Sequence, residues 1–217
     1  MNFKVANLYR KELLKNFSGM GVCVTYKKKS IVDFLNEPSR YIYLIKSGYV
    51  QQYFINNEGN EKILLLLKSG DIFGEITHFQ NDNNQVITKT LVETEFEKIP
   101  VNVFDNYAKE HPEIYYYISL MISNKLRILM AQIQDSSFCN AEDRLKNLLI
   151  RLAFQNGEKV SNGIKINHNF THEELAGMIS STRSTVTRKI KSLEEKGIIE
   201  IKENIIIKDN GYVYKDI

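Results

Sequence analysis

The apolar positions between residues 170 and 199 recur at the spacing of two short helices. The first helix carries Leu175, Ala176, Met178 and Ile179, and the second carries Val186, Ile190 and Leu193. Thr171 followed by Glu174 matches a capping box, which starts a helix, and Gly197 is typical of a helix end. Residues 180–182 interrupt the pattern. The pattern therefore predicts two helices around a tight turn.

The second of these helices separates its polar side chains from its apolar stripe. The other face carries Arg183, Ser184, Thr187, Arg188 and Lys191, and from residue 183 to 191 there are four basic residues and no acidic one. Guanidinium groups bind guanine edges and ammonium groups bind phosphates, so this face fits the major groove of DNA. The alternative is a solvated helix face, which the capping box, the turn and the neighbouring helix disfavour. Thr171 and Thr182, at the two helix starts, are further candidate DNA contacts.

Two apolar runs follow, at residues 198–202 and 205–208, on either side of Glu203-Asn204. They predict a two-stranded ribbon with a tight turn. With the two helices before it, the ribbon makes this region a winged helix-turn-helix.

A long helix is predicted from just after Pro112 to about Ser137. Its apolar stripe has near-heptad spacing and comprises Ile114, Ile118, Met121, Ile122, Leu126, Leu129 and Ile133, with Lys125, Arg127 and Gln132 off the stripe. The stripe either packs on the core of its own domain or pairs with a second copy, and we favour pairing because two-fold DNA readers need a dimer. The next helix is predicted to start at Asn140 and end at Gly157, and to pack under the helix-turn-helix through Leu145, Leu148, Leu149 and Leu152.

The pattern is different between Tyr41 and Ile99, where short strand-like runs are separated by glycines. Gly48, Gly59 and Gly70 follow one another at intervals of eleven residues. Successive strand-turn units are typical of a β-roll, which can enclose a ligand, and helical spacing is absent here. We therefore predict an α+β chain: a β-roll sensor domain (1–112), a dimerisation helix (113–139) and a winged helix-turn-helix domain (140–217).

Composition adds little to this picture. The chain has 217 residues, 43% of them hydrophobic and 25% charged, as in ordinary globular proteins, and its net charge of +3 is too small to indicate nucleic-acid binding by itself. Cys23 and Cys139 match no metal-ligand spacing, so we expect both to be small apolar fillers in a reducing compartment. No signal peptide or membrane-length apolar run is present, which predicts a cytoplasmic protein without membrane association.

In this order of parts, the chain resembles the Crp/Fnr family of bacterial transcription regulators over nearly its whole length. The segments LIKSGYV, NNEGNEKILLLL and KSGDIFGE resemble the glycine pattern of the family's sensor domain, and TRSTVTRKIKSLEEKGII resembles its recognition helix. The resemblance implies that Arg183 and Arg188 read base edges and that Lys191 contacts DNA nearby. Many members have glutamate where this chain has Ser184, so the family's usual half-site does not carry over.

The resemblance also implies an effector pocket, which comprises Gly74, Glu75, Ile76, Asn84, Gln85, Leu126, Leu129 and Met130. Members that respond to cyclic AMP bind its phosphate with an Arg-Ser pair, and this chain has Asn84-Gln85 at that place. The same members bind the adenine with a Thr-Ser pair, and this chain has Leu129-Met130 there. No arginine occurs from Tyr41 to Leu126. Without a charged partner the phosphate would lose a hydrogen bond worth roughly 1.5–3 kcal/mol. We therefore expect an effector other than cyclic AMP.

One histidine in this region has two interpretations. His78 follows Glu75 by three residues and is either a surface or hydrogen-bonded core residue, or an axial haem ligand in an apolar cavity, as in some relatives that sense gases. We favour the first, and expect no other cofactor or metal. His111, His168 and His172 form no ligand spacing and are interpreted as surface residues.

The sequence contains none of the catalytic motifs that indicate an enzyme. A second class of function is a ligand-binding module that acts on protein partners, and the basic helix argues against it. The predicted partners are a double-stranded DNA operator, a second copy of the chain, an unidentified small-molecule effector and, for an activator, RNA polymerase. The sequence does not distinguish activator from repressor.

Overall fold

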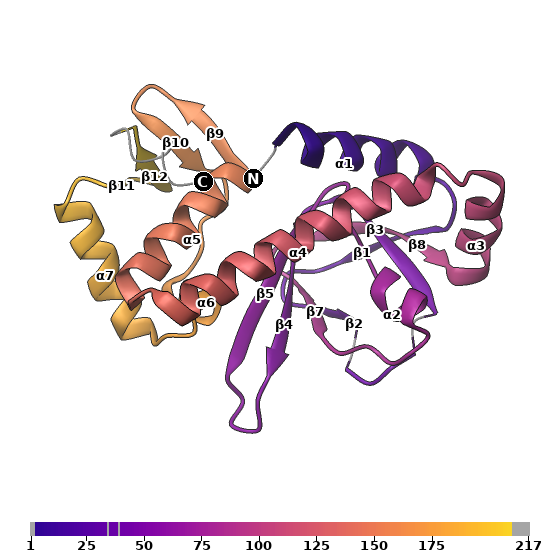
Figure 1. Cartoon of the computed structure of the whole chain (residues 1–217), viewed down its shortest axis with the longest axis horizontal. Helices are drawn as coiled ribbons and strands as arrows, with labels where there is room; N and C mark the ends of the chain where they lie inside the picture. Colours follow the sequence, from indigo (N-terminus) through magenta and orange to yellow (C-terminus); the bar gives the residue numbers. More distant parts are fainter. Residues whose placement is uncertain (1–2, 34, 39, 210–217) are drawn as a thin grey trace. The chain divides into compact units, whose positions relative to one another are not determined.

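The computed structural model describes residues 3–33, 35–38 and 40–209. It divides into two compact units, Asn2–Arg127 and Ile128–Ile217, so that the boundary lies within one long helix (Figure 1). The order of elements confirms the predicted α+β fold, with a β-rich N-terminal part, a long helix and a C-terminal helix-turn-helix. Residues 210–217 of the predicted C-terminal domain lie outside the described residues.

The first unit is built on two four-stranded antiparallel sheets that form the predicted roll. One sheet has the order β1 (Val22–Tyr26), β8 (Thr94–Pro100), β3 (Tyr41–Ser47) and β6 (Ile72–Phe73). The other has the order β2 (Ile31–Asp33), β7 (Ile87–Thr90), β4 (Tyr49–Ile55) and β5 (Glu61–Lys68). The turn between β3 and β4 requires glycine, because Gly48 has a φ of +96° and a Cβ there would meet Thr94 at 2.5 Å.

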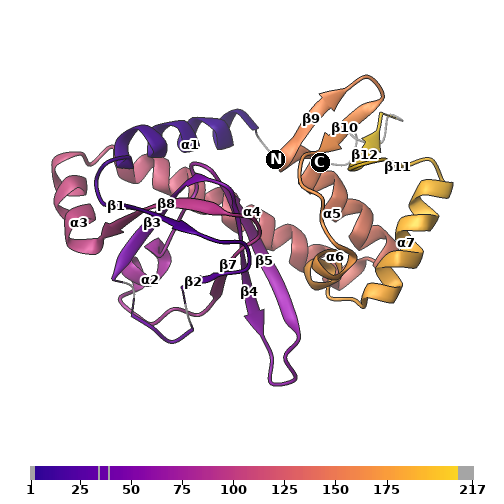
Figure 2. The ribbon, with the colours of Figure 1, turned by 180° about the vertical axis from the view of Figure 1, so that it is seen from behind.

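Helices cover the first sheet and complete the core. Three of them, α1 (Phe3–Phe17), α3 (Val101–Glu110) and the start of α4 (Ile114–Phe138), bury aromatic and aliphatic side chains against β3, β6 and β8 (Figure 2). α1 is also fixed by charge, since Arg10 binds both carboxylate oxygens of Asp71 at 3.0 Å and the Tyr9 hydroxyl donates to the same group at 2.9 Å.

Three helices and two strands of this unit are absent from the prediction. They are α1, α3, β1, β2 and the six-residue helix α2 (Glu75–Gln80), which begins directly after Gly74. The expectation that helix is absent between Tyr41 and Ile99 is therefore wrong at α2, because a helix of that length shows no clear periodicity. Cys23 is also not a filler: it lies exposed on β1, and its thiol donates a hydrogen bond to Glu95 Oε1 at 2.8 Å.

The predicted single stripe of α4 is in fact two stripes. Ile114, Ile118 and Met121 are at most 1% exposed in the core of their own unit, so this part of the stripe packs on its own domain, which was the alternative to pairing. Lys125, expected off the stripe, lies one helical turn beyond Met121 and is buried as well. The second stripe lies further along the helix, where Leu126 is 55% exposed and Ile133 is 65% exposed.

The second unit is a winged helix-turn-helix, as predicted. α5 (Ala141–Asn156) packs against α6 (His172–Ile179) and α7 (Arg183–Glu195), and buries Leu145, Leu148, Leu149 and Leu152. The predicted ribbon is β11 (Ile199–Ile201) and β12 (Ile205–Lys208). A hairpin that the sequence did not predict, β9 (Gly157–Val160) and β10 (Gly163–Ile166), extends it to a four-stranded sheet in the order β11-β12-β10-β9.

Candidate DNA-binding and effector sites

The turn between α6 and α7 is held by the caps of both helices. Thr171 and Glu174 form the predicted capping box of α6. Thr182 caps α7, and its Oγ1 accepts from the backbone N–H of Thr185 at 3.2 Å. Between them Ser180 adopts a φ of +51°, which ends α6 and turns the chain. These local bonds set the start of the second helix.

α7 presents its predicted polar face to solvent and its apolar face to the core. Val186, Ile190 and Leu193 are at most 3% exposed. The exposed side chains on the other face are Arg183, Ser184, Thr187, Arg188 and Lys191. The structure therefore brings all five predicted DNA contacts of this helix to one accessible surface, which we term the reading face.

Two hydroxyl groups on the reading face already have partners. The Thr187 hydroxyl donates to the backbone carbonyl of Arg183 at 3.0 Å, and His172 Nδ1 lies 2.8 Å from the hydroxyl oxygen of Thr187. The Ser184 hydroxyl shares a hydrogen bond of 3.0 Å with that of Thr182. His172, interpreted from the sequence as a surface residue, is half-buried and contributes to this surface.

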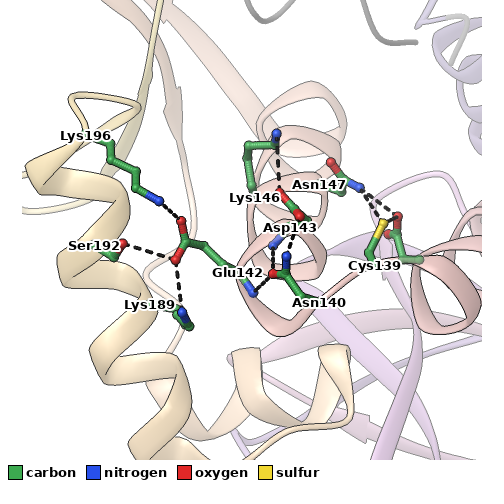
Figure 3. A network of polar contacts seen from close by, with 10 residues as sticks. Cys139, Asn140, Glu142, Asp143, Lys146, Asn147, Lys189, Ser192 and Lys196 are labelled. Atoms are coloured by element: carbon green, nitrogen blue, oxygen red, sulfur yellow. Dashed lines mark hydrogen bonds and ion pairs between the residues drawn. The ribbon is translucent and has the colours of Figure 1, made fainter.

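A carboxylate on α5 holds the side of α7 that faces away from the reading face. Glu142 accepts hydrogen bonds from Lys189 and Ser192 of α7 and from Lys196, the C-cap residue of the same helix (Figure 3). These bonds, with Lys196 and Lys189 foremost, lower the pKa of Glu142 to about 2. This contact is not visible in the sequence, because Glu142 and Lys196 are 54 positions apart.

In the first unit, the carboxylate of the candidate effector pocket is already bound by a lysine. Lys125 Nζ on α4 lies 2.7 Å from Glu75 Oε1 on α2, and it also donates to the carbonyl oxygen of Ile72 at 2.8 Å. The two side chains are only 4% and 1% exposed. Glu75 is therefore not a free acceptor in this structure.

The other candidate effector residues have varied surroundings. Asn84 is buried, and its side chain bonds to the backbone N–H and carbonyl of Val86 at 3.3 and 2.6 Å. Gln85 is exposed, as is Ile76 at 53%. Leu126 and Met130 are 55% and 59% exposed, and Leu129 is half-buried. Gly74 has a φ of +91° at the start of α2.

His78 has a carboxylate partner, as expected for a hydrogen-bonded residue. Its Nε2 lies 2.7 Å from Asp105 Oδ1, and its ring packs edge-on against Phe104. Of the other histidines, His111 is exposed, and His168 packs against Phe170. Among the described residues, no three His, Cys, Asp or Glu side chains are grouped so that they could hold a metal ion.

Comparisons with known proteins identify both units. A model of the cyclic nucleotide-binding domain matches residues 23–111, and a model of the Crp-like helix-turn-helix domain matches residues 143–211. Between them these two matches account for most of the chain. No helix within the described ranges is both long and apolar enough to cross a membrane.

Curated relatives match along most of the chain. The cAMP-activated global transcriptional regulator Vfr of Pseudomonas aeruginosa is 24% identical over 186 residues, which cover 84% of this chain and 86% of Vfr. The anaerobic regulatory protein of Bacillus subtilis is 28% identical over 175 residues, which cover 79% of this chain and 74% of the relative. Both relatives are regulators and not enzymes.

Solved structures have the same fold. A CooA variant from Carboxydothermus hydrogenoformans aligns with a TM-score of 0.76 at 28% identity, covering 93% of this chain and 88% of CooA. The c-di-GMP responsive regulator CLP of Xanthomonas campestris aligns with a TM-score of 0.77 at 20% identity, covering 92% of this chain and 100% of CLP. With a cyclic nucleotide-binding domain followed by a Crp-like helix-turn-helix, the chain belongs to the Crp/Fnr family of DNA-binding transcription regulators.

Proposed function

We propose that this regulator is a homodimer that binds an inverted-repeat operator through the reading face of α7, and that its effector is not cyclic AMP. The observation that carries the first part is the reading face itself, where Arg183 and Arg188 are exposed on a helix whose opposite sides are buried or ion-paired. Arginine binds the O6 and N7 atoms of guanine with two hydrogen bonds, which gives sequence discrimination.

The test is a gel-shift titration with an operator selected from random duplexes. Arg183→Ala or Arg188→Ala should each cost roughly 1–3 kcal/mol of operator affinity and relax the preference at one base pair per half-site. Lys11→Ala, an exposed lysine on α1, serves as the control and should bind as the unmodified protein does. Unchanged affinity in both arginine variants, or a footprint on one half-site only, would refute the proposal.

The second stripe of α4 supports the dimer. Two series at seven-residue spacing lie on one side of the helix: Tyr115, Ile122 and Leu129, and Ser119, Leu126 and Ile133. All six are exposed or half-buried in the single chain. Five of the six are aliphatic or aromatic and Ser119 is polar, so the set is close to the pattern of two apolar positions in each heptad by which parallel helices pair. Half-sites separated by about 34 Å require a two-fold partner.

Two features of the first unit support an effector other than cyclic AMP. The Glu75 carboxylate is buried and its Oε1 is already bound by Lys125, so a nucleotide ribose would compete with an ammonium group for this acceptor. The region from Tyr41 to Leu126 contains no arginine to neutralise a cyclic phosphate, and its Lys89 is paired with Glu61 at 2.7 Å. Both sources of nucleotide affinity are therefore weakened.

Isothermal titration of the purified dimer with cyclic AMP and cyclic GMP tests this part. We expect no binding tighter than the high micromolar range and no increase in operator affinity, because a ligand shifts an equilibrium only by its differential affinity for the two states. A low-micromolar dissociation constant would contradict the proposal. Native mass spectrometry and an absorption spectrum of the same sample would detect any co-purified effector, including haem.

A further inference from the structure

Glu142 lies in the first turn of α5, where the cap of that helix holds its backbone. Asn140 caps α5, and its side chain accepts from the backbone N–H groups of Glu142 and Asp143 at 2.9 and 3.1 Å. A carboxylate in this turn is stabilised by the helix dipole. The Glu142 side chain is 16% exposed and extends toward α7 (Figure 3).

One carboxylate accepts from three donors, two on a single side of α7 and one on its C-cap residue. Glu142 Oε2 accepts from Lys189 Nζ and from Ser192 Oγ, both at 3.1 Å, and Oε1 accepts from Lys196 Nζ (Figure 3). Lys189, Ser192 and Lys196 follow one another by three and four residues, which places them one above another on the helix surface. Hydrogen bonds to a charged group are stronger than neutral ones.

α7 therefore has three sides with different roles. The apolar side, Val186, Ile190 and Leu193, holds the helix to the core. The side bound to Glu142 makes directional bonds to a fixed point. The third side is the reading face, whose arginine side chains are long enough that a small rotation of the helix moves their ends away from base edges.

We propose that Glu142 is a positioning residue for DNA readout, which fixes the rotation of α7 about its axis. This proposal rests on the proposed reading face. The fixed rotation acts on specificity, because it strengthens contacts with the correct bases, whereas phosphate contacts bind any duplex.

A neighbouring arginine ties the same turn of α5 to α6. Arg144 Nε donates to the carbonyl oxygen of Ile179, the last residue of α6, at 3.0 Å, and its Nη1 donates to the carbonyl oxygen of Cys139 at 3.0 Å. The first turn of α5 thus binds α7 through Glu142 and α6 through Arg144. The helix-turn-helix is anchored at both of its helices by one short segment.

The experiment compares the full-length protein with its Glu142→Gln variant on the selected operator and on a random duplex of equal length, at several salt concentrations. The amide keeps the volume and an acceptor oxygen but removes the charge. We expect operator affinity to fall about tenfold, within the roughly 5- to 150-fold discrimination that one bidentate arginine contact supplies. Affinity for the random duplex should stay equal or rise, with a steeper salt dependence.

Controls separate this proposal from the one it rests on. Glu158→Gln, which removes a 62%-exposed partner of Lys165 in the same unit, should leave the ratio of operator to random affinity unchanged. Arg183→Ala and Arg188→Ala variants that both keep the ratio would refute the reading face. If Arg183→Ala lowers the ratio of operator to random-duplex affinity but Glu142→Gln leaves that ratio unchanged, only the positioning role is overturned.

Equal losses on both duplexes would also overturn the proposal, because they indicate damage to the whole unit. If Glu142→Gln does not fold by circular dichroism, the double variant Lys189→Met, Lys196→Met tests the same contact from α7. It should lower operator affinity without raising random-duplex affinity. A preserved ratio of the two affinities in this double variant would refute the positioning role.

Discussion

Replacing Lys125 by methionine tests whether α2 and α4 are joined by a buried ion pair. The substitution keeps the length and the apolar stem of the side chain but removes the ammonium group that lies 2.7 Å from Glu75 Oε1. The Glu75 carboxylate then stays in a site where its side chain is 1% exposed. Removing one partner of a buried pair costs about 3–5 kcal/mol, because the remaining charge has no compensation.

The expected effect is large enough for a simple thermal melt. For a chain of this size about 1 kcal/mol corresponds to 2–4 °C, so the unfolding of the first unit should move down by roughly 6–20 °C. The chain contains no tryptophan, so far-ultraviolet circular dichroism is the suitable signal. The double variant Glu75→Leu, Lys125→Met should recover most of the loss, since an apolar replacement of both partners is often neutral.

A matched control is the Lys89 pair on the second sheet. Lys89 and Glu61 are also 2.7 Å apart, but their side chains are 21% and 35% exposed, and pairs of this kind contribute about 0–1 kcal/mol. Lys89→Met should therefore have little effect. Should Lys125→Met destabilise the protein no more than Lys89→Met does, the reasoning about the buried pair is wrong.

Three further predictions concern assembly, DNA affinity and acid stability. Leu126→Glu, a charge in the exposed stripe of α4, should give monomers in sedimentation experiments and abolish operator binding, and a variant that stays dimeric would place the interface elsewhere. Lys191→Ala should weaken binding to all sequences alike and lower the salt slope by about one, which filter binding measures. The second unit should lose stability in acid as Glu142 is protonated: its pKa is lowered from 4.5 to about 2 by Lys196 and Lys189, so the contribution is complete above about pH 4.5 and disappears as the pH falls through 2. Glu142→Gln should remove that part of the pH dependence in urea melts.

The DNA-binding part was predictable because its signals are local. The capping box joins residues three apart, and the burial of Val186, Ile190 and Leu193 follows from helical spacing alone. The contacts that complete the sites are distant in sequence: Lys125 and Glu75 are 50 positions apart, and Glu142 and Lys189 are 47 apart. Lys125 lies on the buried side of α4, and only the fold, which places α2 beside α4, identifies Glu75 as its partner.

The exposed stripe of α4 also has a consequence for how much regulator a cell needs. If two chains must join before both half-sites can be occupied, the amount of competent regulator rises with the square of chain concentration while the dimer is the minor species. A twofold change in synthesis would then produce about a fourfold change in operator occupancy at low levels. The side chains at Leu126, Met130 and Ile133, each more than half exposed in a single chain, would make this protein respond to its own abundance as well as to any effector.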